Sequence, residues 1–171
     1  MNGAIFFSGQ YGSTAQYANR IGEATGLPVF DVKEANADPS KYELLILGSS
    51  VIVYRLTIRK WVKAHRASIE NKLTILFTVS GASAGPKLDG WIAASLPETL
   101  LAQMKHVAPR GRLNHAEVSW WIRLILKMGA LVNPDPEARR EELEGFDYVK
   151  KSNIDPVLQL AEQLRMQVDT R

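Results

Sequence analysis

Three short segments of the sequence combine glycine with hydroxyl side chains, which are residue types that can hold an anion without a charged side chain. They are residues 8–14 (SGQYGST), 48–50 (GSS) and 80–85 (SGASAG). Hydroxyl groups and the backbone N–H groups at the start of a helix suit a phosphate monoester. The first segment has neither the lysine of a nucleoside-triphosphate loop nor the glycine spacing of a dinucleotide loop. It therefore predicts a phosphate held by neutral donors, unless Ser13 or Thr14 simply caps the following helix.

Each of these segments follows a short apolar run that is typical of a buried parallel strand. The three runs are residues 4–7, 44–47 and 73–79, and weaker strand patterns occupy residues 27–32 and 106–113. The last of these contains Pro109 and Gly111, which indicate an edge strand or a bulge. Apolar residues at helical spacing predict helices over residues 15–25, 57–68, 88–96, 98–104, 118–131 and 155–168. The charged stretch 133–151 is expected to be mostly loop or short helix.

Strands that alternate with helices at roughly 30-residue spacing predict a parallel sheet with helices on both faces. In such sheets, ligands bind beyond the carboxyl ends of the strands. All three glycine- and hydroxyl-rich segments directly follow expected strands, so we expect them to converge on one site.

The composition fits one globular domain over residues 1–171 and limits the chemistry. The formal net charge of +3 is spread along the chain without a block of like charge, so a nucleic-acid-binding arm is not expected. The absence of cysteine excludes disulfides, thiolate ligands and cysteine nucleophiles. His65, His106 and His115 lack metal-ligand spacing, and no metal site is predicted. The sequence shows no secretion signal and no long apolar span, and we expect a cytoplasmic protein.

The segment 8–14 resembles the phosphate loop of flavodoxins, in which hydroxyl residues and a glycine directly follow the first strand. Ser8, Gly12, Ser13 and Thr14 keep this pattern, whereas Gln10 stands where flavodoxins usually have a small hydroxyl residue. The resemblance implies a flavodoxin-like three-layer α/β sandwich, with a five-stranded parallel sheet in the order 2-1-3-4-5 and helices on both faces. It also implies that the cofactor is FMN.

Further along, the chain is similar to the menaquinone-dependent protoporphyrinogen dehydrogenase family. The similarity is carried by residues 48–54 (GSSVIVY), 61–65 (WVKAH) and 121–129 (WIRLILKMG), with the charged stretch 135–142 after them. That family is a single flavodoxin-like domain that binds FMN and is associated peripherally with the inner face of a membrane. Its basic insertion after the fourth strand is missing here, because Lys87 is the only basic residue between positions 82 and 104.

Carried over by motif, the resemblance implies three groups of cofactor-binding residues. The phosphate would be held by Ser8, Gln10, Tyr11, Gly12, Ser13 and Thr14. The isoalloxazine would be flanked by Ser49, Ser50, Val51, Ile52, Val53 and Tyr54, and a third wall would come from Ser80, Gly81, Ala82 and Gly85. Tyr54 is the best candidate to stack on the ring, although an amphipathic residue at a strand end gives the same pattern. No catalytic residue is assigned.

Residues 118–131 carry apolar side chains around more than one helical face. One interpretation is a core helix between the sheet and the C-terminal region. The other is an interfacial helix that meets lipid, a quinone or a partner chain, with Arg123 and Lys127 on one side. Trp120 and Trp121 are the residues that we expect to face a membrane or a second copy of the chain.

The leading functional hypothesis is an FMN-dependent oxidoreductase. If the resemblance extends to activity, the flavin takes electrons from protoporphyrinogen and delivers them to a quinone in heme biosynthesis. The propionate carboxylates of the porphyrinogen would then meet basic residues near the mouth of the site, namely Arg55, Arg59, Lys87 and Arg123. The alternatives are a flavodoxin-type electron carrier without its own substrate and a flavin-free scaffold of the same fold. Typical flavodoxins are strongly acidic, and the net positive charge therefore disfavours the carrier.

Overall fold

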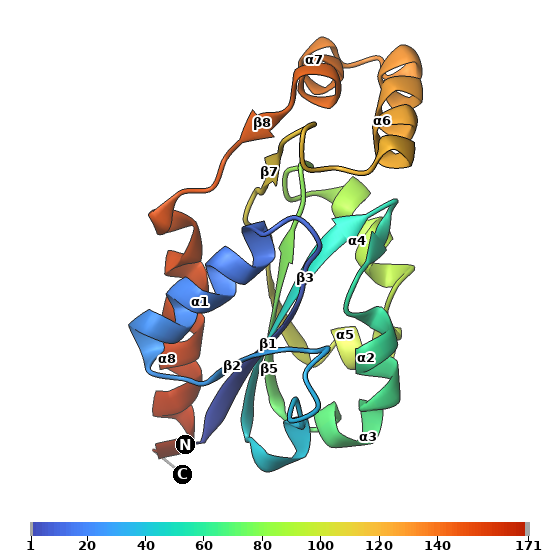
Figure 1. Cartoon of the computed structure of the whole chain (residues 1–171). Coiled ribbons are helices and arrows are strands. Elements are labelled where there is room, and N and C mark those ends of the chain that lie inside the picture. Colours follow the sequence, from blue (N-terminus) through green and yellow to red (C-terminus); the bar gives the residue numbers. More distant parts are fainter. Residues whose placement is uncertain (1, 170–171) are drawn as a thin grey trace.

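The computed structural model describes residues 2–169, and its centre is a parallel β-sheet (Figure 1). The parallel strands are β1 (Gly3–Ser8), β2 (Val29–Asp31), β3 (Leu44–Ile52), β5 (Leu73–Val79) and β6 (Met104–Val107). They lie in the order β2-β1-β3-β5-β6, and every neighbouring pair among them is parallel. Counted along the chain, these are the first to fifth parallel strands, so the expected order 2-1-3-4-5 is confirmed.

Helices cover both faces of the sheet, as predicted (Figure 1). One face packs against α1 (Ser13–Thr25) and α8 (Asp155–Asp169), and the other against α2 (Arg59–Ala64), α3 (Arg66–Ile69), α4 (Pro86–Ala93) and α5 (Glu98–Leu101). Short 3₁₀ helices, η1 (Pro39–Lys41) and η2 (Lys151–Ile154), lie in the connections. Because side chains alternate along a strand, Leu44 and Ile46 pack with α1 and α8, whereas Leu45 and Leu47 pack on the other face. The result is a three-layer sandwich with a core on each side of the sheet.

A helical hairpin projects beyond the carboxyl ends of the strands (Figure 1). It consists of α6 (Trp120–Val132) and α7 (Pro136–Glu144), and the antiparallel pair β7 (Arg112–Leu113) and β8 (Phe146–Asp147) lies at its base. Asp135 starts α7 by accepting hydrogen bonds from the backbone N–H groups of the first turn. The stretch expected as loop or short helix is therefore one helix of 9 residues followed by a short strand.

Four expected elements differ from the observed ones. The helix expected over 98–104 ends at Leu101, and Met104 already belongs to β6. The fifth strand ends at Val107, because Pro109 has no N–H group with which to continue the ladder. The helix expected over 57–68 is divided at His65, whose ring nitrogen and backbone N–H both approach the carbonyl of Trp61 (2.9 and 3.0 Å). The segment after Gly48 first continues as a strand, since β3 runs to Ile52 and turns back as β4 (Arg55–Leu56). The loop at this place is therefore the tight turn at Val53 and Tyr54.

Within residues 2–169, none of the helices is long and apolar enough to cross a lipid bilayer.

Candidate functional site

The N-terminus of α1 is uncapped and open. Gly12 precedes the helix with a φ angle of 84°, and no side chain caps the helix. The hydroxyl of Thr14 lies 2.7 Å from that of Ser50, and the hydroxyl of Ser13 accepts a hydrogen bond of 3.3 Å from the backbone N–H of Arg112. Neither hydroxyl is therefore the helix cap that the sequence left open as an alternative. No acceptor for the N–H groups of the first turn lies within residues 2–169.

The phosphate-loop geometry leaves room for an anion at this helix end. A Cβ atom on Gly12 would meet no atom within 4 Å, so the turn is open. Gly9 is required for close packing instead, because a Cβ there would lie 2.9 Å from the Cβ of Thr14. The helix macrodipole places partial positive charge at this point, and residues 8–14 contain no charged side chain. The loop can therefore hold an anion through neutral donors, as the sequence predicts.

The tip of the β3–β4 hairpin is strained and lies at the site. Val53 and Tyr54 connect the paired residues Ile52 and Arg55, and both have positive φ angles, 46° and 61°. Positive φ at both central positions is the requirement of a type I′ turn, which normally uses Asn and Gly. Two ordinary side chains are held there instead, exposed to 45% and 55%. The Tyr54 ring lies 5.1 Å from that of Trp91, between ring centroids, so the turn presents an aromatic pair at the site.

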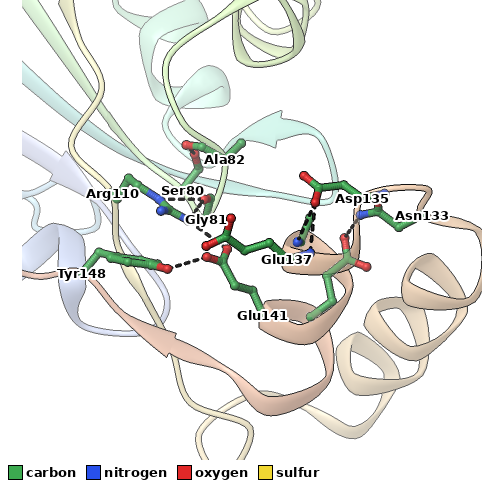
Figure 2. A network of polar contacts seen from close by, with 11 residues as sticks. Ser80, Gly81, Ala82, Arg110, Asn133, Asp135, Glu137, Glu141 and Tyr148 are labelled. Atoms are coloured by element: carbon green, nitrogen blue, oxygen red, sulfur yellow. Dashed lines mark hydrogen bonds and ion pairs between the residues drawn. The ribbon is translucent and has the colours of Figure 1, made fainter.

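The third loop is tied to the helical hairpin by Arg110 (Figure 2). The Arg110 guanidinium donates two hydrogen bonds to the carbonyl of Gly81 (2.9 and 3.1 Å) and forms an ion pair of 2.8 Å with Glu141. It also stacks on Tyr148, 3.6 Å from the ring centroid, and the Tyr148 hydroxyl donates a hydrogen bond to Glu141. Glu141 raises the pKa of Tyr148 by accepting this bond, because the bond stabilises the protonated phenol. We call the contacts among Gly81, Arg110, Glu141 and Tyr148 the Arg110 clasp.

A cavity of about 290 Å³ lies between the three loops and the helical hairpin. Its loop side contains residues of all three segments, so the convergence that the sequence predicts is confirmed. Its hairpin side is largely apolar and includes Val118, Ile122, Ile125, Leu126 and Phe146. The cavity thus has a polar, backbone-rich wall opposite an apolar one, which is the usual character of a small-molecule site.

Most of the predicted cofactor-binding residues line this cavity, namely Tyr11, Ser13, Ser50, Val51, Ile52, Val53, Tyr54, Ser80, Gly81 and Ala82. The others lie outside the lining: Ser8, Gln10, Gly12, Thr14, Ser49 and Gly85. The carbonyl of Ser8 accepts a hydrogen bond of 2.7 Å from Thr57, and the fully buried Ser49 hydroxyl donates to the Ser50 carbonyl (2.9 Å). Cofactor contact through these outer residues stays a prediction.

Several cavity residues were missed by sequence reasoning, chiefly Trp91, Gly111, Arg112 and the α6–α7 residues Ile122, Leu126, Glu141 and Glu142. The sequence pointed to the α6 residues only through the excess of apolar residues over 118–131. A single buried stripe of a helix accounts for only some of these residues, so the others indicate a second apolar contact. Trp91 and Arg112 gave no signal, since their positions depend on how distant loops pack.

The residues present fit FMN. The open α1 N-terminus suits its single phosphate, and the adjoining cavity, with Tyr54 and an apolar wall, suits a flat ring. The Tyr11 hydroxyl lines the cavity side of the phosphate loop and is buried without a hydrogen-bond partner within residues 2–169. A buried hydroxyl of this kind needs a partner, which a polar cofactor would supply.

Comparisons with known structures bear on the fold. The structure resembles that of the Trp repressor binding protein from Bacillus subtilis, with a TM-score of 0.50 and 13% identity, over 84% of this chain and 96% of that chain. The flavodoxin of Megasphaera elsdenii in its two-electron reduced state gives a TM-score of 0.49 and 16% identity, over 63% of this chain and 82% of that chain. At 13% identity, the likeness to the Bacillus subtilis protein concerns the fold alone. No curated protein matches the chain.

Residues 4–138 match a family model described as a flavodoxin domain. This range contains all three loops, α6 and the start of α7. Together with the open helix end and the cavity, the match points to FMN binding and to an electron-transfer or oxidoreductase role. The chain belongs to the flavodoxin domain family.

Proposed function

We propose that the protein is an FMN-dependent dehydrogenase that takes electrons from a porphyrinogen and delivers them to a quinone, in heme biosynthesis. The observation that carries this proposal is the helical hairpin over the cavity. Val118, Ile122 and Leu126 face the polar loops across the cavity, so a redox partner that reaches a ring bound there meets an apolar wall. A flat apolar quinone or tetrapyrrole suits such a wall better than the charged surface of a partner protein.

Two basic residues at the cavity support a substrate with carboxylate groups. Lys87 and Arg112 line the cavity and are exposed, and the Lys87 ammonium lies 5.5 Å from the ring centroid of Trp91. Arg112 is 3.3 Å from Glu117, an exposed ion pair of the kind that contributes little and breaks readily. Both cations are therefore available to propionate groups.

The other expected basic residues are less suited to this role. Arg55 donates to the carbonyl of Ala94, and Arg59 donates to that of Leu56 (2.9 Å). Arg123 donates to the carbonyl of Val118 (3.1 Å). These bonds hold the three guanidinium groups against backbone carbonyls. Lys87 and Arg112 are thus the residues to which we assign carboxylate recognition.

The residues of this chain would bind and orient the reacting groups. The first-turn N–H groups of α1 would hold the phosphate, and Tyr54 with Trp91 would limit the position of the ring. The Arg110 clasp fixes the Gly81 carbonyl and holds α7 beside the cavity. FMN, when bound, supplies transfer of one or two electrons between donor and acceptor.

The test is anaerobic turnover with the purified, FMN-loaded protein, a porphyrinogen as donor and menadione as acceptor. Porphyrin fluorescence should appear only with the quinone present. Lys87→Gln and Arg112→Gln should each raise KM for the porphyrinogen with kcat little changed, while Arg140→Gln, an exposed change on α7, should leave both unchanged. A protein that binds FMN, forms a stable one-electron semiquinone and shows no turnover would instead be an electron carrier.

A further inference from the structure

Helix α6 exposes a large apolar surface that the fold does not cover. Seven of its large apolar side chains are exposed: Trp120, Trp121, Leu124, Ile125, Met128, Leu131 and Val132. They occupy a helix of 13 residues that projects beyond the sheet (Figure 1). Contiguous apolar patches of this size on a protein surface mark an interaction site. The opposite face of the helix, with Ile122 and Ala130 buried, packs against the rest of the protein.

Helical geometry shows how this surface is organised. At about 100° per residue, the exposed apolar side chains from Trp120 to Ile125 span an arc of about 140°. Arg123 and Lys127 lie together along one border of this arc, between it and the buried face. An apolar arc bordered by cations, with tryptophan at one end, is the pattern of a helix that lies in the plane of a membrane surface.

The charges on α6 favour an anionic lipid surface over a second copy of the chain. The helix contains Arg123 and Lys127 and no acidic residue. In an antiparallel two-fold pair of α6 helices, both cation borders would fall on the same side and repel each other. Anionic headgroups would instead pair with Lys127 and with the terminal amino groups of Arg123, whose bond to the Val118 carbonyl uses Nε, while the apolar arc enters the acyl region.

The α7 carboxylate that approaches α6, that of Glu142, lies on the inner side of the helix. The carboxylate of Glu142 packs against Gly129, since a Cβ on Gly129 would lie 3.5 Å from its Oε2 atom. Gly129 belongs to the inner face of α6, on the side away from Leu124 and Leu131. The Glu142 carboxylate therefore lies on the inner side of α6, away from Leu124 and Leu131.

The exposed arc is continuous with the cavity. Ile125 lines the cavity and is also 37% exposed on the outer surface of α6. Leu126, its neighbour, lines the cavity from the inner face. We propose that α6 docks the protein on an anionic membrane surface, with its axis in the membrane plane and its Trp120–Val132 arc in the lipid. Apolar molecules dissolved in the bilayer would then reach the cavity without crossing bulk water.

The test is sedimentation of the full chain, loaded with FMN, with vesicles of phosphatidylcholine alone or mixed with phosphatidylglycerol. Binding should require phosphatidylglycerol and weaken with salt. Arg123→Gln with Lys127→Gln should lower the partition coefficient about twenty-five-fold, at about fivefold for each cation, and Arg140→Gln on α7 should change it little.

A matched apolar pair separates the arc from apolar surface in general. Leu124 and Leu143 are exposed to 51% and 50%, but Leu143 lies on α7. Leu124→Ser should reduce vesicle binding at least tenfold, since the loss of buried methylene groups weakens insertion, and Leu143→Ser should not. Both positions are exposed, so both variants should fold, which their FMN absorbance and thermal unfolding would verify.

The proposal is overturned if the wild type does not bind phosphatidylglycerol vesicles, or if Leu124→Ser and Leu143→Ser bind equally. It is also overturned if the chain is a stable dimer that Leu124→Ser converts to a monomer, because the arc would then be a contact between copies. Vesicle binding needs no turnover, so its failure leaves the proposed function standing, and loss of turnover leaves docking standing.

Discussion

Replacing Val53 with asparagine should stabilise the protein, although it removes an apolar side chain. Val53 is a β-branched residue with a φ angle of 46°, and the left-handed conformation costs an ordinary residue about 1–2 kcal/mol. Asparagine adopts this conformation far more readily. The side chain is 45% exposed, so the burial that is lost amounts to less than about 1 kcal/mol. The net gain is about 1 kcal/mol, which for a chain of 171 residues raises Tm by about 2–4 °C.

The assay is thermal unfolding of the FMN-free protein, followed by circular dichroism. Val132→Asn is the control, because Val132 is also exposed but does not have a positive φ angle, so Tm should stay nearly unchanged. A Val53→Asn protein that melts at or below the wild-type temperature would refute the strain reasoning. The companion variant Tyr54→Asn relieves similar strain but removes the ring, and FMN affinity should fall about threefold to tenfold.

Three further outcomes are expected. Tyr17→Phe should cost about 1–3 kcal/mol in urea unfolding, because the Tyr17 hydroxyl donates to the Arg110 carbonyl (2.8 Å) and accepts from Asn153 (2.7 Å); a cost below about 0.5 kcal/mol would contradict this. Removing the charge of Glu141 with Glu141→Gln should lower the pKa of Tyr148 toward its ordinary value, seen as phenolate absorbance at lower pH than in the wild type. Desolvation lowers the pKa of His106 in the folded protein, so as the pH falls the unfolded chain is protonated there first, and the stability of the fold should decline below about pH 6.5. His106→Gln should lessen this decline. An unchanged dependence of stability on pH in this variant would argue against the role of His106.

The sheet and the place of the site were accessible from the sequence because they depend on local patterns. A parallel strand buried on both faces is a continuous apolar run, and residues 44–47 and 73–79 show this plainly. The glycine- and hydroxyl-rich segments at the ends of such runs must meet at one edge of the sheet. The alternation of side chains between the two faces of a strand did not reveal which residues reach the site. Ser49 is buried in the structure whereas its neighbour Ser50 lines the cavity, and both were assigned to the site.

The helical hairpin α6–α7 over the cavity could not be predicted from the sequence, because its position depends on contacts between residues far apart in the chain. Arg110 and Glu141 are 31 positions apart, and each alone has the pattern of an ordinary surface charge. The β7–β8 pair and the bridge between Ser80 and Arg110 bring them together with Tyr148 and the Gly81 carbonyl. The split of the expected helix at His65 likewise follows from a local side-chain contact that hydrophobic spacing does not encode.

The binding of FMN phosphate at the α1 N-terminus is tested most directly by two nearly isosteric variants, Gly12→Asp and Gly12→Asn. Gly12 has open space around it and a φ angle of 84°, which strains any side chain, but Asp and Asn enter this region more readily than other residues and share the strain. The two proteins therefore differ in one negative charge. The quantity to measure is the dissociation constant for FMN and for riboflavin, which lacks the phosphate. We expect Gly12→Asp to bind FMN at least about tenfold more weakly than Gly12→Asn, with equal affinity of the two for riboflavin. Equal FMN affinity of the two variants would contradict a phosphate site at this helix end.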